Sequence, residues 1–166
     1  MTRTALLAAA LLAATPLAAA PMVAAPPAAE FVKMAGASDL YEKTSSQLVL
    51  KTTKDAKVKA FARMMVADHG KTTADVTAAA KRDGLKPMPP KLMPKQAKMI
   101  AELKATSAGQ RDKVYLTQQV AAHEEALALH TAYSTGGDKP ALKAASAGAV
   151  PIVETHLNEV KTLAGM

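Results

Sequence analysis

Three histidines are the residues of this chain whose type and spacing could do chemistry. His69, His123 and His156 each lie near the middle of a different segment with helical periodicity. Each takes a position on the apolar stripe of its segment where a leucine would be expected. Imidazoles that converge inside a helical bundle form either a metal site or a buried hydrogen-bonded network, and the spacing leaves both readings open.

Two carboxylates could complete such a metal site. Glu42 falls level with the histidines in one of two competing helical registers of its segment. Asp68 directly precedes His69, and because adjacent helical residues point about 100° apart, it is either a flanking ligand or a solvated charge. The predicted metal ligands are His69, His123 and His156, with Glu42 or Asp68 completing the shell.

Imidazole and carboxylate ligands suit zinc, iron, copper or manganese, and ligand type does not choose among these metals. A divalent cation would also compensate a buried carboxylate, which otherwise costs several kcal/mol. We identify no catalytic residue and no site for an organic cofactor. The run His123-Glu124-Glu125 lacks the second histidine of a zinc-protease motif, because Leu127 occupies that place. We therefore favour a non-enzymatic role and leave the question of activity open.

Helical periodicity after the first 30 residues predicts an all-α fold. Long helices are expected over about 30–51, 55–82, 110–134 and 139–164, each with one inward stripe. A proline-rich connection leads into a short extra helix over about 94–106. We expect a turn over 107–109 and Asp138 as the cap of the last helix. Pro151 should kink the last helix or split it near 147–150. The pattern predicts a four-helix bundle with a long crossover between its second and third long helices.

The N-terminal segment has the features of a cleaved export signal. A positive residue, Arg3, precedes an apolar run and several small residues, and the run is too short to span a bilayer. We predict a signal peptide over 1–25, a linker over 26–29 and the bundle domain over 30–166. The mature protein would then be soluble and periplasmic or secreted. The chain has no cysteine, which excludes disulfides and a lipid anchor on cysteine.

The chain is basic, with 21 Lys and Arg against 14 Asp and Glu and a net charge of +7. Nucleic acid is not the expected partner, because the lysines are scattered and only 3% of the residues are aromatic. Weak attraction to anionic envelope surfaces follows more naturally from this charge. The sequence predicts no oligomeric state.

Several segments together resemble a known family. They are residues 31–42, 58–62, 65–69, then Asp112, Tyr115 and His123, and finally Pro151 with His156 and Leu157. Over about 30–163 the chain resembles the exported bacterial family numbered 4142 among domains of unknown function. The resemblance implies a ferritin-like four-helix bundle in which residues 84–109 form the crossover. Members often carry an outer-membrane label, but this chain has no cysteine for a lipid anchor.

The resemblance brings no function, and it weakens one reading of the histidines. Ferritin-like di-iron proteins place a glutamate three residues before the histidine on two helices. Here Val66 precedes His69 and Val153 precedes His156 at that spacing. A single-metal site therefore fits better than a di-iron centre.

Two functional hypotheses follow. In the first, the chain is an exported ferritin-like protein that binds one transition metal through its histidines. In the second, it is a non-catalytic envelope or stress-associated bundle that acts as an interaction or structural protein. The histidines would then form a buried hydrogen-bonded network.

Overall fold

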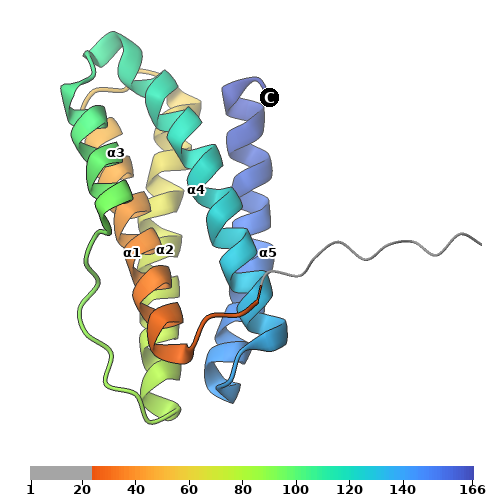
Figure 1. Cartoon of the computed structure of the whole chain (residues 1–166). Helices are drawn as coiled ribbons and strands as arrows, with labels where there is room; N and C mark the ends of the chain where they lie inside the picture. The colour runs from red at the N-terminus through yellow and green to blue at the C-terminus, as the bar shows by residue number, and fades with distance from the viewer. Residues whose placement is uncertain (1–23) are drawn as a thin grey trace, which may run out of the picture.

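The computed structural model describes residues 24–166, and most of the predicted signal peptide lies outside them. The described chain is all-α, as predicted (Figure 1). Its helices are α1 (Ala28–Val49), α2 (Ala56–Arg82), α3 (Pro94–Ala105), α4 (Ala108–Gly136) and α5 (Pro140–Ala164). Helix α1 thus begins two residues before the expected start of the domain.

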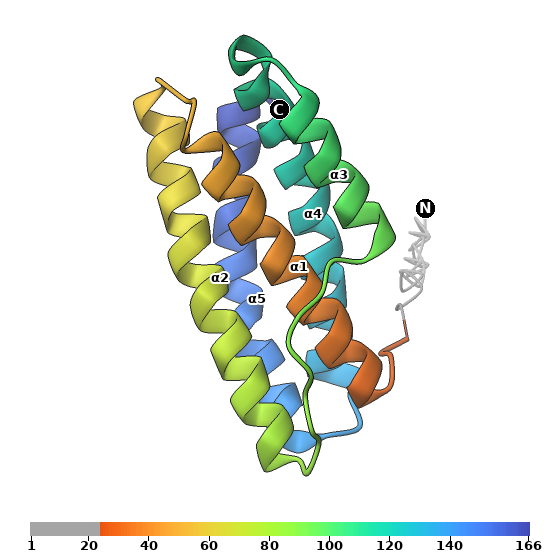
Figure 2. The same cartoon turned by 90° about the vertical axis from the view of Figure 1, so that its left-hand side faces the viewer.

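Four long helices, α1, α2, α4 and α5, lie side by side, and α3 packs outside them against α1 and α4 (Figures 1 and 2). Helices α1 and α2 are antiparallel, and so are α4 and α5. The connection after α2 returns along the whole bundle before α4 begins, so α2 and α4 run in the same direction. This path is the long crossover that the sequence predicts between the second and third long helices.

The crossover is fixed at its start and near its middle. Helix α2 ends at Gly84, whose φ of +82° is a left-handed conformation that glycine adopts without strain. Further along, Pro90 packs so closely on Gly36 of α1 that an added Cβ at Gly36 would lie 3.2 Å from the proline ring. Figure 2 shows the crossover passing across α1 at this level.

Two local expectations, the turn over 107–109 and the cap of α5, are wrong. Residues 108 and 109 belong to the first turn of α4 rather than to a separate turn, and Ser107 is the residue that precedes this helix. Asp138 does not cap α5, because its carboxylate accepts a hydrogen bond from the Tyr133 hydroxyl. Helix α5 continues through Pro151, so the proline does not split it, although it removes one backbone donor.

The bundle interior has two apolar clusters with a polar layer between them. One cluster joins the end of α1 and the start of α2 to Tyr115 and Val160. The other joins the start of α1 and the end of α2 to Tyr133 and Leu142. The buried residues of the layer between them are Asp39, Glu42, Ser45, Ser46, His69, Thr72, Gln119, His123, Ser146 and His156. Burial of so many polar groups is costly unless they find partners.

None of the helices formed by residues 24–166 combines the length and apolar character needed to cross a bilayer.

Candidate metal centre

The three predicted histidines meet in the polar layer. His69 comes from α2, His123 from α4 and His156 from α5, and their side chains are 2%, 0% and 2% exposed. Their ring centroids form a nearly equilateral triangle with sides of 5.4–5.5 Å. One ring nitrogen from each lies within 4.8 Å of the other two. The helical stripes thus bring together side chains that are far apart in the sequence.

Two of these imidazoles have their tautomer set by an acceptor. Nδ1 of His123 donates to the backbone oxygen of Gln119 at 2.8 Å. Nε2 of His156 donates to Oδ2 of Asp68 at 3.0 Å. A neutral imidazole carries one proton, so the other nitrogen of each ring keeps a free lone pair. These free atoms are Nε2 of His123 and Nδ1 of His156.

The third imidazole faces two carboxylates of α1. Nδ1 of His69 lies 2.9 Å from Oδ1 of Asp39, to which it donates, and 2.8 Å from Oε2 of Glu42. Asp39 also accepts hydrogen bonds from the hydroxyls of Thr72 and Thr73. Residues of α1 therefore contact Nδ1 of His69, and Nε2 lies on the opposite side of the same ring.

All three remaining ring nitrogens are buried without a hydrogen-bond partner among the described residues: Nε2 of His69, Nε2 of His123 and Nδ1 of His156. A buried polar atom without a partner costs about 1–3 kcal/mol, so three cost about 3–9 kcal/mol. That sum is comparable with the whole stability of a typical domain. The three histidines could hold a metal ion, which would give such nitrogens a partner.

Glu42 adds a buried negative charge to the same layer. Its side chain is 0% exposed, and neither carboxylate oxygen has a hydrogen bond with suitable geometry. Burial opposes its ionisation, but the adjacent His69 and His123 outweigh burial and hold the pKa of Glu42 below its usual value. Oε1 of Glu42 lies 3.6 Å from Nδ1 of His123, so this carboxylate reaches two members of the triad.

The three imidazoles differ in charge. Burial alone would lower the pKa of His69, but Glu42 and Asp39 reverse that effect and raise its pKa to about 10. Burial and the nearby His69 charge lower the pKa of His156 to about 4, against the effect of Asp68. Burial also lowers the pKa of His123. Without a metal at neutral pH, His69 is therefore cationic and the other two are neutral.

Comparison with known proteins identifies the family but not the function. Residues 12–163 match the domain of unknown function DUF4142. The chain belongs to this family. A solved structure, the crystal structure of a DUF305 fragment from Deinococcus radiodurans, is similar to it with a TM-score of 0.70 and 16% identity. The match covers 84% of this chain and 99% of the fragment, and at that identity it shows the fold alone. No curated protein matches the chain.

The structure settles where each carboxylate near the DUF4142 triad lies. Asp68 points across to His156 of α5 rather than to its sequence neighbour His69, and its side chain is 39% exposed. Asp39 joins the site although the sequence analysis missed it. The available signal was its spacing from Glu42, because residues three apart share a helix face.

Gln119 and His130 lie near the triad but have other contacts. The Gln119 amide donates to Ser45 across the bundle, so only its backbone oxygen serves His123. His130 packs its ring edge against Phe31, with centroids 5.5 Å apart, toward the other apolar cluster. His130 is buried and does not join the triad.

Stability of the metal-free DUF4142 chain should peak between about pH 6.5 and 7. Below pH 6.5 the unfolded chain protonates histidines whose folded pKa is lowered, so stability falls as the pH drops toward 4. Above pH 6.5 the contribution of the His69 proton declines and is lost as the pH rises through about 10. Each effect should amount to about 2–3 kcal/mol between pH 6.5 and 5 or between pH 6.5 and 9, because one unit of pKa shift corresponds to about 1.4 kcal/mol.

Urea unfolding with a chelator at pH 5, 6.5 and 9 measures this profile. At pH 5 most ordinary carboxyl groups remain ionised, so the loss of stability between pH 6.5 and 5 reports the protonation of the histidines. His156→Gln should make that decline shallower. A stability that does not change from pH 5 to 9 would contradict the assigned charges.

Proposed function

We propose that this protein binds one divalent transition-metal ion in the polar layer of its bundle. The ligand atoms are Nε2 of His69, Nε2 of His123 and Nδ1 of His156. The observation that carries the proposal is that each of these buried nitrogens lacks a partner while the second nitrogen of the same ring has one. Metal-binding histidines characteristically donate their other N–H to a carboxylate or a backbone carbonyl.

The surrounding acceptors then have defined roles. Asp39, Asp68 and the backbone oxygen of Gln119 each orient one imidazole through its N–H. Glu42 contacts the same Nδ1 atom of His69 that donates to Asp39. Glu42 and Asp68 thus lie beside the protonated nitrogens and not beside the free ones. They would support the three ligands by orienting the imidazoles and balancing the charge of a bound ion, which would supply Lewis-acid chemistry.

Charge balance supports a divalent ion. Without metal, the buried carboxylates Asp39 and Glu42 face a single imidazolium, His69. When an ion takes the place of the His69 Nε2 proton, two positive charges face the two carboxylates. The interior then becomes neutral, which removes the cost of an uncompensated buried charge.

The spacing requires only a small adjustment. A tetrahedral ion about 2.0–2.1 Å from each nitrogen needs those nitrogens ~3.4 Å apart. One ring nitrogen of each histidine lies within 4.8 Å of one ring nitrogen of the other two.

Elemental analysis of the protein, produced with its own N-terminal segment and without a histidine tag, tests the proposal. About one zinc, copper, iron or manganese per chain is expected, or one equivalent taken up when these metals are added to chelator-treated protein. Less than a tenth of an equivalent in both measurements would rule the proposal out. Cell fractionation in the same preparation tests the export that we propose from the N-terminal segment.

Metal binding at pH 8 should release about one proton per ion. His69 is the protonated member of the triad at that pH, because its pKa is about 10, and it must lose one proton to offer Nε2. His123 and His156 are already neutral and contribute none. Calorimetric titrations with zinc in buffers of different ionisation enthalpy measure the number. Release of no proton, or of two or more, would contradict this assignment.

A further inference from the structure

The crossover and α3 carry more positive than negative charge, unlike the two helices that follow them. Residues 85–107, which form the crossover and α3, contain five lysines and one acidic residue, Glu102. Residues 108–166, which form α4 and α5, contain five basic and six acidic residues. The positive charge is therefore distributed unevenly over the molecule, and an anionic surface would orient the molecule.

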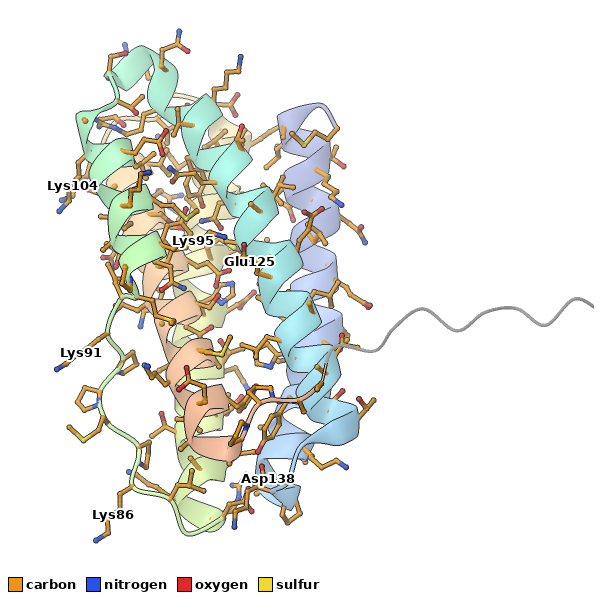
Figure 3. All side chains as sticks on the ribbon, in the orientation of Figure 1. Lys86, Lys91, Lys95, Lys104, Glu125 and Asp138 are labelled. Carbon is orange, nitrogen blue, oxygen red and sulfur yellow. The ribbon has the colours of Figure 1, made fainter. Side chains whose placement is uncertain are left out.

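The lysines of this segment are displayed on the outside of the bundle. Lys86, Lys91 and Lys104 point away from the helices on the same side of the molecule (Figure 3). Lys98 is exposed as well, and none of these four forms an ion pair among residues 24–166. Lys95 differs from them because it pairs with Glu125 of α4. We call Lys86, Lys91, Lys98, Lys104 and the exposed Met88 the crossover face.

Apolar surface accompanies these charges. A groove of about 620 Å³ runs between the crossover and the start of α1, and its lining includes Val32, Leu85 and Leu92. Lys33, Lys86 and Lys91 also line it, and none of its lining residues is acidic. Met88 stands out of the crossover with 78% of its surface exposed, between two prolines. Such a side chain gains free energy when it leaves water.

We propose that the crossover face lies on anionic lipid bilayers, with its lysines at the headgroups and Met88 inserted among them. Unpaired lysines and an exposed apolar side chain on the same segment match the two forces that hold proteins at membrane interfaces. Nucleic acid fits less well, because no aromatic side chain lies in residues 85–107 to stack on a base. The proposal is independent of the metal centre, which lies inside the bundle.

Sedimentation with vesicles tests the proposal. The protein without its signal segment should bind vesicles of 30% phosphatidylglycerol in phosphatidylcholine at low ionic strength, and should not bind pure phosphatidylcholine. The double variant Lys86→Glu, Lys91→Glu should bind at least about tenfold more weakly, since each lysine near an anionic surface contributes to the attraction. The control, Lys139→Glu with Lys143→Glu at the start of α5, changes the net charge equally. It should weaken binding less than threefold.

A fluorescent reporter tests the insertion of Met88. The chain has no tryptophan, so Met88→Trp introduces a single one on the crossover face. Its emission should shift to shorter wavelength when phosphatidylglycerol vesicles are added. Met166→Trp is the matched control, because Met166 is 71% exposed and lies at the end of the chain, beyond α5. Its emission should stay unchanged.

Three results would overturn the proposal. The first is absence of binding to the anionic vesicles. The second is an equal loss of binding in the two double variants, which would indicate a net-charge effect without a preferred face. The third is binding of soluble laurate in the groove by a protein that does not bind vesicles. That outcome would assign the same surface to a free amphiphile.

Discussion

His123→Gln should abolish the stabilisation that a divalent metal gives to the wild-type protein. A ligand present at 100 times its dissociation constant adds about 2.7 kcal/mol, which corresponds to several degrees in Tm for a domain of this size. The variant keeps the bundle but loses one of three ligands. We therefore expect its metal affinity to fall by more than the 10–100-fold that loss of an outer partner costs. Thermal unfolding with and without zinc measures both effects.

His130→Gln is the matched control for this experiment. His130 is also a buried histidine of α4, but it lies outside the triad and packs against Phe31. Its replacement should lower stability without removing the response to zinc. Equal zinc responses in the His123 and His130 variants would show that the triad does not bind the metal.

His69→Leu should destabilise the metal-free protein by about 3–5 kcal/mol, the usual cost of removing one partner from a buried charge pair. The reason is that Glu42 and Asp39 remain buried when the imidazolium that both contact is gone. His123→Leu should cost clearly less, because His123 is neutral and donates to a backbone oxygen. Urea unfolding in the presence of a chelator compares the two variants directly.

The double variant His69→Leu, Glu42→Leu identifies the origin of that loss. If the buried charge is responsible, the second substitution should restore part of the stability. Restoration would be partial because Asp39 also loses a partner, although Thr72 and Thr73 still donate to it. Additive losses in the double variant would show that the pair interacts little and that packing explains the single variant. Both variants should fail to bind metal.

The sequence predicts the bundle well where a helix buries one face. Spacing of three and four residues predicts an inward stripe of seven residues in the second long helix, and all seven are buried: Val58, Ala62, Met65, His69, Thr72, Val76 and Ala79. In α1 two registers compete, and the structure explains why. The stripe with Glu42 faces the bundle core, while Tyr41 is buried in a separate cluster with Ile100 of α3. Because α3 covers a second face of α1, periodicity alone could not separate the two registers.

The triad was predictable because each histidine occupies a core position of its own helix. The hydrogen-bond partners of the triad were not predictable. From its position on α2, Asp68 could have faced either of the two helices that pack against α2. Only the packing of α2 against α5 directs it to His156. Asp39 lies outside the stripe that the sequence analysis followed, and its role depends on the position of His69 Nδ1. The protonated nitrogen of each ring follows from such contacts, so the free nitrogens became visible only in the structure.

The polar layer also bears on how the bundle unfolds. Because it separates two apolar clusters, each end of the metal-free bundle has its own hydrophobic core, and between them the four long helices meet mainly through polar side chains. Such a molecule tends to open one end at a time rather than all at once. An ion bound to α2, α4 and α5 would link the two ends into a single cooperative unit. Metal content would then determine how far local opening spreads along the bundle.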